Sequence, residues 1–142
     1  IRHKIYGALL LIDLNNIKEV NYLHGHDAGD AVLVEMAKRL DSLTRFEDVL
    51  GRLVGDKFVV LIDHLDVDRK IAIDKSLIVA DKLIKAVSRP FEYNGFTLQV
   101  GASVGVSLIE FEHLGADAII RKANVALYRV KKSGEQRAIF SD

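Results

Sequence analysis

Two aspartates lie at positions where a carboxylate can do chemistry. Asp13 directly follows the apolar run 6–12, and a carboxylate at the end of a buried strand is costly unless it is solvated, paired or bound to a metal ion. Asp13 could instead be the N-cap of a helix over residues 15–18. Asp56 lies between two short apolar runs, where it could form a turn or bind a ligand, and Lys57 places a positive charge beside it.

The apolar pattern predicts the elements that position these residues. The run 6–12 is typical of a buried strand, and the runs around Asp56 predict a β-hairpin over about 48–63. Helical spacing predicts helices at 15–23, 31–43, 71–87 and 115–132, with a loop at 25–29. A second hairpin at Asn94-Gly95 and strands at 98–109 and 137–140 complete the pattern. This order predicts one α/β domain with a mixed central sheet flanked by helices.

Composition narrows the possible functions. The 142 residues, 49% of them hydrophobic and 28% charged, fit one globular domain with its own core. A net charge of zero argues against a nucleic-acid surface, and the lack of cysteine excludes disulfides and thiolate metal sites. No apolar run is long enough to span a membrane. Because the chain starts at Ile1, we expect residues 1–142 to be a single domain cut from a longer protein.

Two segments carry a resemblance to a known family. The hairpin segment Val54-Gly55-Asp56-Lys57-Phe58 and the stretch from Asp13 to Asp30 together resemble the GGDEF family, the diguanylate cyclases of bacterial signalling. In that family the hairpin reads Gly-Gly-(Asp/Glu)-Glu-Phe. The resemblance covers nearly the whole chain. It implies the palm-like fold shared by nucleotidyl cyclases and polymerases, with the active site at the edge of the sheet.

The resemblance implies that Asp13, Asp56 and the backbone carbonyl of Leu14 hold Mg²⁺ against the triphosphate of GTP. Lys57 replaces the second acid of the motif, and an ammonium about 4 Å from the metal would repel it by roughly 8 kcal/mol at an effective dielectric of about 20. Lys57 could also point away or contact a phosphate. Val54 replaces the first glycine and disfavours a positive φ. We therefore expect cyclase activity to be lost or strongly impaired.

The same resemblance assigns a nucleotide site. It implies that Asn21 and Asp30 pair with the guanine base, that Lys131 binds phosphate and that Lys18 also belongs to the GTP site. The ordinary alternatives are a solvated helix residue for Asn21 and for Lys18, an N-cap for Asp30, and a cation favoured by the helix dipole for Lys131. Glu135 stands where the family has a phosphate-binding arginine. This second charge reversal also indicates a degenerate catalytic site.

A further pair stands five residues before the hairpin motif. Arg45 and Asp48 have the spacing of the family's inhibitory site, which implies that they hold the product cyclic-di-GMP. An arginine can bind phosphate in a fork or stack on guanine, and an aspartate can accept guanine N–H groups. The alternative is a solvated charge pair before a strand.

Three functions stay open at this point. The first is a regulatory module that senses cyclic-di-GMP or GTP, the second an active cyclase that converts two GTP molecules within a homodimer, and the third a dimerisation scaffold that binds no nucleotide. The resemblance also implies a cytoplasmic setting and a covalently linked phosphodiesterase (EAL) or sensor domain. The parent protein could be tethered to a membrane, but we expect this domain to contact neither membrane nor nucleic acid.

Overall fold

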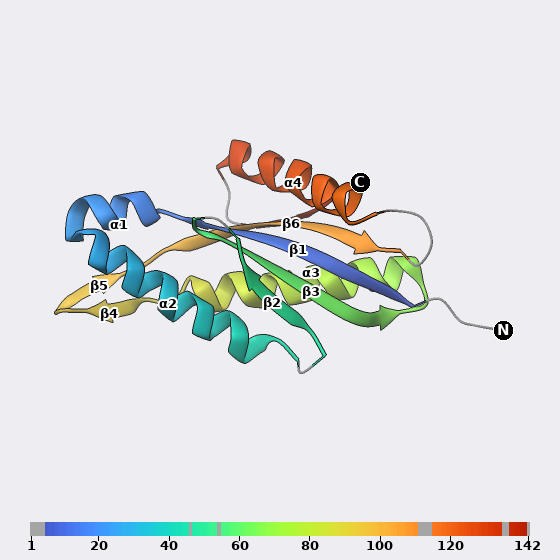
Figure 1. Ribbon diagram of the computed structural model, residues 1–142, viewed down its shortest axis with the longest axis horizontal. Coiled ribbons are helices and arrows are strands. Elements are labelled where there is room, and N and C mark those ends of the chain that lie inside the picture. The colour runs from blue at the N-terminus through green and yellow to red at the C-terminus, as the bar shows by residue number, and fades with distance from the viewer. Residues whose placement is uncertain (1–4, 46, 54, 111–114, 135–136, 142) are drawn as a thin grey trace.

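The strand β1 (Tyr6–Asn15) runs through the centre of the molecule, and all its residues between the two ends are buried. The computed structural model describes residues 5–141 except 46, 54, 111–114 and 135–136 (Figure 1). The other elements, in chain order, are α1 (Ile17–His24), α2 (His26–Leu43), β2 (Val49–Arg52), β3 (Lys57–Asp66), α3 (Arg69–Val87), β4 (Phe91–Tyr93), β5 (Phe96–Leu98), β6 (Gly101–Ile109), α4 (Ala116–Ser133) and β7 (Ala138–Phe140).

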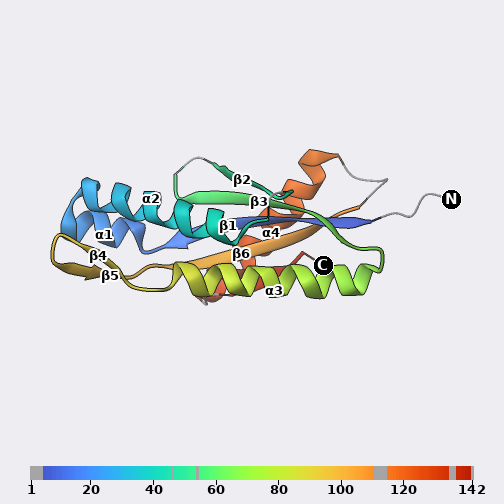
Figure 2. The ribbon, with the colours of Figure 1, turned by 90° about the horizontal axis from the view of Figure 1, so that it is seen from below.

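Five strands form one mixed sheet in the order β2-β3-β1-β6-β7. The pairs β1–β3, β1–β6 and β2–β3 are antiparallel, and β6–β7 is parallel. Even-numbered residues of β1 belong to the main core with α1, α2 and α3, whereas Leu9 and Leu11 pack against α4 on the opposite face (Figure 2). The predicted mixed sheet flanked by helices is therefore confirmed, and β4 and β5 form a separate small hairpin.

The prediction of a loop at 25–29 was wrong. Only Gly25, with a φ of 92°, separates α1 from α2, so the second helix begins at His26 rather than at residue 31. Gly29 has a packing role inside this helix, because a Cβ at that position would lie 1.8 Å from Oδ1 of Asn21. The glycine that resembled a loop signal therefore allows α1 and α2 to pack closely.

The helix α4 lies unusually close to β6 at Gly105. A Cβ on Gly105 would lie 2.1 Å from the carbonyl oxygen of Ala123 and 2.6 Å from the backbone nitrogen of Leu127. Ser107, two residues along the strand, donates a hydrogen bond from its hydroxyl to the carbonyl of Ile119 at 2.8 Å. These contacts fix the height of α4 above the sheet and so determine where Lys131, near the end of that helix, can reach.

Among the residues that the structure describes, none of the helices combines the length and the apolar character that crossing a bilayer requires.

Candidate functional site

Asp13 is buried at the end of β1, with 4% of its surface exposed. Its Oδ2 accepts a hydrogen bond from the Nζ of Lys131, which reaches over from α4. Its Oδ1 is also buried and has no hydrogen-bond partner within the described part of the chain. The helix α1 begins at Ile17 with Asn16 as its N-cap residue, so the alternative that Asp13 caps this helix was wrong.

Lys57 lies directly opposite Asp13 in the ladder between β1 and β3. Directly opposed residues of an antiparallel pair share a face, with Cβ atoms about 5 Å apart. Val59 and Leu61 pack on the face that α4 covers, and the alternation of β3 puts Lys57 on that face too. In the described part of the chain, the ammonium of Lys57 has no hydrogen bond or ion pair, and that group is therefore available to a ligand or to Asp13.

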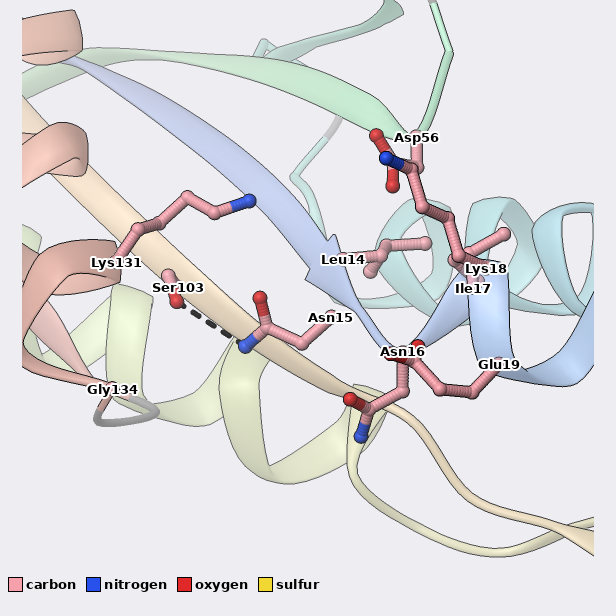
Figure 3. Close-up of a pocket in the computed structure, with 10 residues that line it drawn as sticks. All are labelled: Leu14, Asn15, Asn16, Ile17, Lys18, Glu19, Asp56, Ser103, Lys131 and Gly134. Carbon is pink, nitrogen blue, oxygen red and sulfur yellow. Dashed lines mark hydrogen bonds between the residues drawn. The ribbon is translucent and has the colours of Figure 1, made fainter.

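A cavity of about 380 Å³ lies where the end of β1, the start of α1, the β2–β3 turn and the end of α4 meet. Figure 3 shows Lys131 extending from α4 on one side, with Asp56 and Lys18 on the other. The lining residues are Leu14, Asn15, Asn16, Ile17, Lys18, Glu19, Asp56, Ser103, Lys131 and Gly134. The structure thus brings four predicted site residues together around one cavity: Leu14, Lys18, Asp56 and Lys131.

Two backbone features shape the cavity: a left-handed residue at Asn16 and a hydrogen bond between Leu14 and Asp56. Asn16 has a φ of 72° in the left-handed region, which asparagine tolerates better than most residues, and this turns the chain from β1 into α1. Leu14 donates its backbone N–H to the carbonyl of Asp56 at 3.1 Å, which holds the hairpin turn against β1. The cavity lies at the ends of two inner strands, not along a lateral edge of the sheet.

Ser103 is a lining residue that the sequence analysis missed. The Nδ2 of Asn15 donates a hydrogen bond to its hydroxyl at 3.2 Å, across the β1–β6 ladder (Figure 3). A signal was present, because Ser103, Gly105 and Ser107 recur at every second residue of an otherwise apolar strand. Such a period-two stripe of small residues indicates a face that another element approaches closely.

Asn21 and Asp30 are not among the residues that line this cavity. Asn21 lies at the contact between α1 and α2, where its Oδ1 is buried without a hydrogen-bond partner in the described residues. Asp30 is exposed and lies within α2, so the alternative that it caps a helix starting at Ala31 was wrong. Their pairing with guanine stays a prediction. Val54 and Glu135, the other two departures from the family pattern, lie outside the described residues.

Arg45 and Asp48 form a separate cluster. The Asp48 carboxylate accepts hydrogen bonds from three Arg45 atoms: the backbone N at 2.9 Å, Nε at 3.3 Å and Nη2 at 3.2 Å. The Nη2 of Arg45 also donates to the carbonyl of Asp63 at 2.8 Å. The hydrogen bond to Asp48 raises the pKa of the Arg45 guanidinium. The Arg45 side chain is 50% exposed but that of Asp48 only 6%, so the arginine is the part that a ligand could contact.

This cluster is distant from the cavity along the hairpin. In the β2–β3 ladder Val49 pairs with Leu61, while Arg52 pairs with Phe58 near the turn that carries Asp56. Arg45 and Asp48 precede β2, so they lie at the opposite end of the hairpin from Asp56. The structure therefore separates the two predicted ligand sites.

The chain matches the family model for "Diguanylate cyclase, GGDEF domain" over residues 2–137, and it belongs to the GGDEF family. It is 34% identical over 135 residues to diguanylate cyclase A of Treponema denticola, and 33% identical over 133 residues to the bifunctional diguanylate cyclase/cyclic di-GMP phosphodiesterase MucR of Pseudomonas aeruginosa. Each alignment spans 94% of this chain, but only 35% and 18% of the respective relatives.

A solved structure agrees with this assignment. The GGDEF domain of PA1120 (YfiN or TpbB) from Pseudomonas aeruginosa is 31% identical and superposes with a TM-score of 0.87, covering 97% of this chain and 83% of that one. The predicted fold, a mixed sheet flanked by helices as in the nucleotidyl cyclases of this family, is therefore confirmed. The chain is a GGDEF domain of cyclic-di-GMP signalling.

GGDEF cyclases are generally metal-dependent, so the charges around Asp13 decide whether a divalent ion fits here. Asp13, Asp56 and the Leu14 carbonyl offer hard oxygen donors, and the unpartnered Oδ1 of Asp13 would suit a cation. Oδ2, however, already binds the ammonium of Lys131. Lys57 carries a second ammonium on a side chain whose Cβ lies next to that of Asp13, so a divalent ion on Asp13 would meet two positive charges. These residues do not fit a divalent ion.

Proposed function

We propose that this GGDEF domain is a regulatory nucleotide-binding module of cyclic-di-GMP signalling and that it is impaired as a cyclase. The observation that carries this proposal is the position of Lys57, which lies opposite Asp13 on the face where the ammonium of Lys131 already pairs with that carboxylate. Cyclase chemistry in this family depends on a metal at the carboxylates, and the same charges that oppose a metal favour a polyphosphate. We propose GTP as the nucleotide in the cavity.

The cavity offers polyphosphate-binding groups of several kinds. Lys18 and Lys131 line it from opposite sides, and the first turn of α1 presents backbone N–H groups that have no partner within the helix. Ser103 adds a hydroxyl on the floor formed by the sheet. A triphosphate carries enough charge to bind both lysines together. Asn21 and Asp30 are the proposed contacts to guanine.

The test is calorimetric titration of GTP into nucleotide-stripped protein, with turnover to cyclic-di-GMP measured on the same sample. We expect saturable binding without measurable product. Lys131→Ala should weaken binding about tenfold, because it removes a charged contact to phosphate. The matched control is Lys122→Ala, which removes an exposed lysine from the same helix and should leave affinity unchanged. Measurable product from the native protein, at a rate equal to that of a Lys57→Glu variant, would instead identify an active cyclase.

A second ligand site is favoured by the orientation of Arg45. Its guanidinium is held in one place by Asp48 and the Asp63 carbonyl, yet half of the side chain stays exposed. A planar cation fixed in this way can bind phosphate or stack on a base without a large loss of side-chain entropy. We propose that it binds cyclic-di-GMP at the end of the hairpin distant from Asp56.

Titration of cyclic-di-GMP tests this second site separately. We expect binding that is lost in Arg45→Ala and kept in Arg121→Ala, which removes an exposed arginine from α4. Binding that survives Arg45→Ala would show that the cluster is only a structural charge pair. If neither GTP nor cyclic-di-GMP bound, the domain would be a scaffold for dimerisation.

The proposed setting is a longer, cytoplasmic signalling protein in which this domain, over residues 1–142, regulates a linked phosphodiesterase (EAL) or sensor domain. The bifunctional name of MucR supports a phosphodiesterase as the neighbour. Purification of a full-length chain, followed by assay of its phosphodiesterase activity with and without GTP, would test whether this domain regulates the phosphodiesterase.

A further inference from the structure

The charges at the cavity are balanced without a metal ion. The described residues that line it, together with Asp13 and its cross-strand neighbour, include three carboxylates and three ammonium groups: Asp13, Glu19, Asp56, Lys18, Lys57 and Lys131. With the family's glutamate in place of Lys57 there would be four carboxylates against two ammonium groups, a charge of −2. One divalent cation would neutralise that charge, and Lys57 makes the same correction by itself.

The position of Lys57 fits this role. Its Cβ lies next to that of Asp13 on the sheet face below α4, so the ammonium on its four-carbon stem can reach the carboxylate. The Oδ1 atom of Asp13 is buried without a partner among the described residues, and it is therefore an unmet acceptor for such a donor. The other oxygen is already bound by Lys131.

The position of Lys57 also bears on the energetic cost of moving Lys131 from Asp13 to a bound phosphate. If Lys131 turned from Asp13 to a phosphate, it would leave a buried carboxylate without a counter-charge, which is unfavourable. Lys57 can neutralise Asp13 in its place. Lys131, whose side chain is 44% exposed, is then free to bind the ligand together with Lys18 across the cavity.

We propose that this site binds the polyphosphate of its nucleotide without a divalent metal ion, with Lys57 neutralising Asp13 and with Lys18 and Lys131 holding the phosphates. This inference rests on the proposed function of the cavity as a GTP site. The preferred ligand would then be free GTP rather than GTP bound to a divalent metal ion.

The experiment compares GTP titrations by calorimetry in EDTA and in excess Mg²⁺. For the native protein we expect affinity in EDTA to equal or exceed that in Mg²⁺. For Lys57→Glu we expect affinity in EDTA to fall at least about tenfold below that in Mg²⁺, because the charge of the site changes by two units. Lys57→Gln should lie between the two. The control Lys38→Glu makes the same charge change on an exposed residue of α2 and should behave as the native protein does.

The outcomes separate this inference from the function on which it rests. GTP binding by the native protein only in Mg²⁺ would overturn metal-free binding and leave the nucleotide module standing. An absence of GTP binding in both buffers would overturn both. Equal metal dependence in native protein and Lys57→Glu would show that Lys57 does not take the place of the ion.

Discussion

The close approach of α4 to β6 at Gly105 makes a sharp prediction about stability. Gly105→Ala adds one methyl group between the helix and the central sheet. That Cβ would lie 2.1 Å from the Ala123 carbonyl oxygen and 2.6 Å from the Leu127 nitrogen, whereas ordinary contacts begin at 3.4 Å. Both opposing atoms belong to the helix backbone, so no side chain can rotate to make room.

The size of the effect follows from the displacement that the clash requires. To lengthen 2.1 Å to 3.4 Å the helix must retreat by more than 1 Å over its buried residues, which include Ile119, Ala123 and Leu127. Overpacking of this kind typically costs 1–3 kcal/mol, and the rigidity of the opposing backbone places this case at about 3 kcal/mol. For a domain of this size, that is a large part of the whole free energy of unfolding.

The assay is urea unfolding followed by circular dichroism, for the native protein and for two alanine variants. Gly51→Ala, on the edge strand β2, is the control. The added Cβ would meet only the end of the Val59 side chain, at 3.2 Å. We expect Gly51→Ala to change stability by less than about 0.5 kcal/mol. If the two variants unfolded at the same urea concentration, α4 would not be held at this height by the glycine.

Two further predictions concern the connection between β3 and α3. The pKa of Asp66 is lowered, first by the hydrogen bond from the backbone N–H of Asp68 and then by Lys75. The ionised Asp66 side chain therefore stabilises the fold fully above the ordinary aspartate pKa of about 4, and this stabilisation is lost as pH falls through the lower pKa of the folded state. Urea unfolding between about pH 2 and 6 should therefore show a shallower acid loss for Asp66→Asn, and an identical slope would refute this. Asp68 caps α3 by accepting the N–H of Ile71 at 3.0 Å, so Asp68→Ala should cost about 1 kcal/mol in the same assay, whereas Asp81→Ala on the exposed face of α3 should cost almost nothing.

The fold was predictable wherever local periodicity and burial agree. The apolar run of β1, the Asn94-Gly95 hairpin and the long helices α3 and α4 each carry a local pattern that predicts the element found there. The stretch 25–29 was predicted wrongly because glycine has two uses, and no local signal separates them. Gly25 has a positive φ and breaks the chain between two helices, whereas Gly29 is helical and makes room for Asn21.

The sequence identified residues of the candidate site, but not which of them contact one another. Asp13, Asp56 and Lys131 were identified by motif, yet nothing within the sequence reports that Lys131 binds Asp13 across 118 residues. That contact depends on the height of α4, which Gly105 controls from another strand. The helix N-cap alternatives for Asp13 and Asp30 failed for a related reason, because each assumed that the nearest helix would begin immediately after the aspartate.

Asp13 links the stability of the domain to its ligand. A carboxylate that is 4% exposed needs a counter-charge, and the one that it has belongs to the helix that covers the cavity. A ligand that attracts Lys131 therefore competes with an interaction that holds α4 to the sheet. A glutamate at position 57 could not supply the counter-charge that Asp13 would then lack. In the metal-free binding that we propose, Lys57 opposite Asp13 supplies that counter-charge from within the chain, while the link between α4 and the sheet is given up to the ligand.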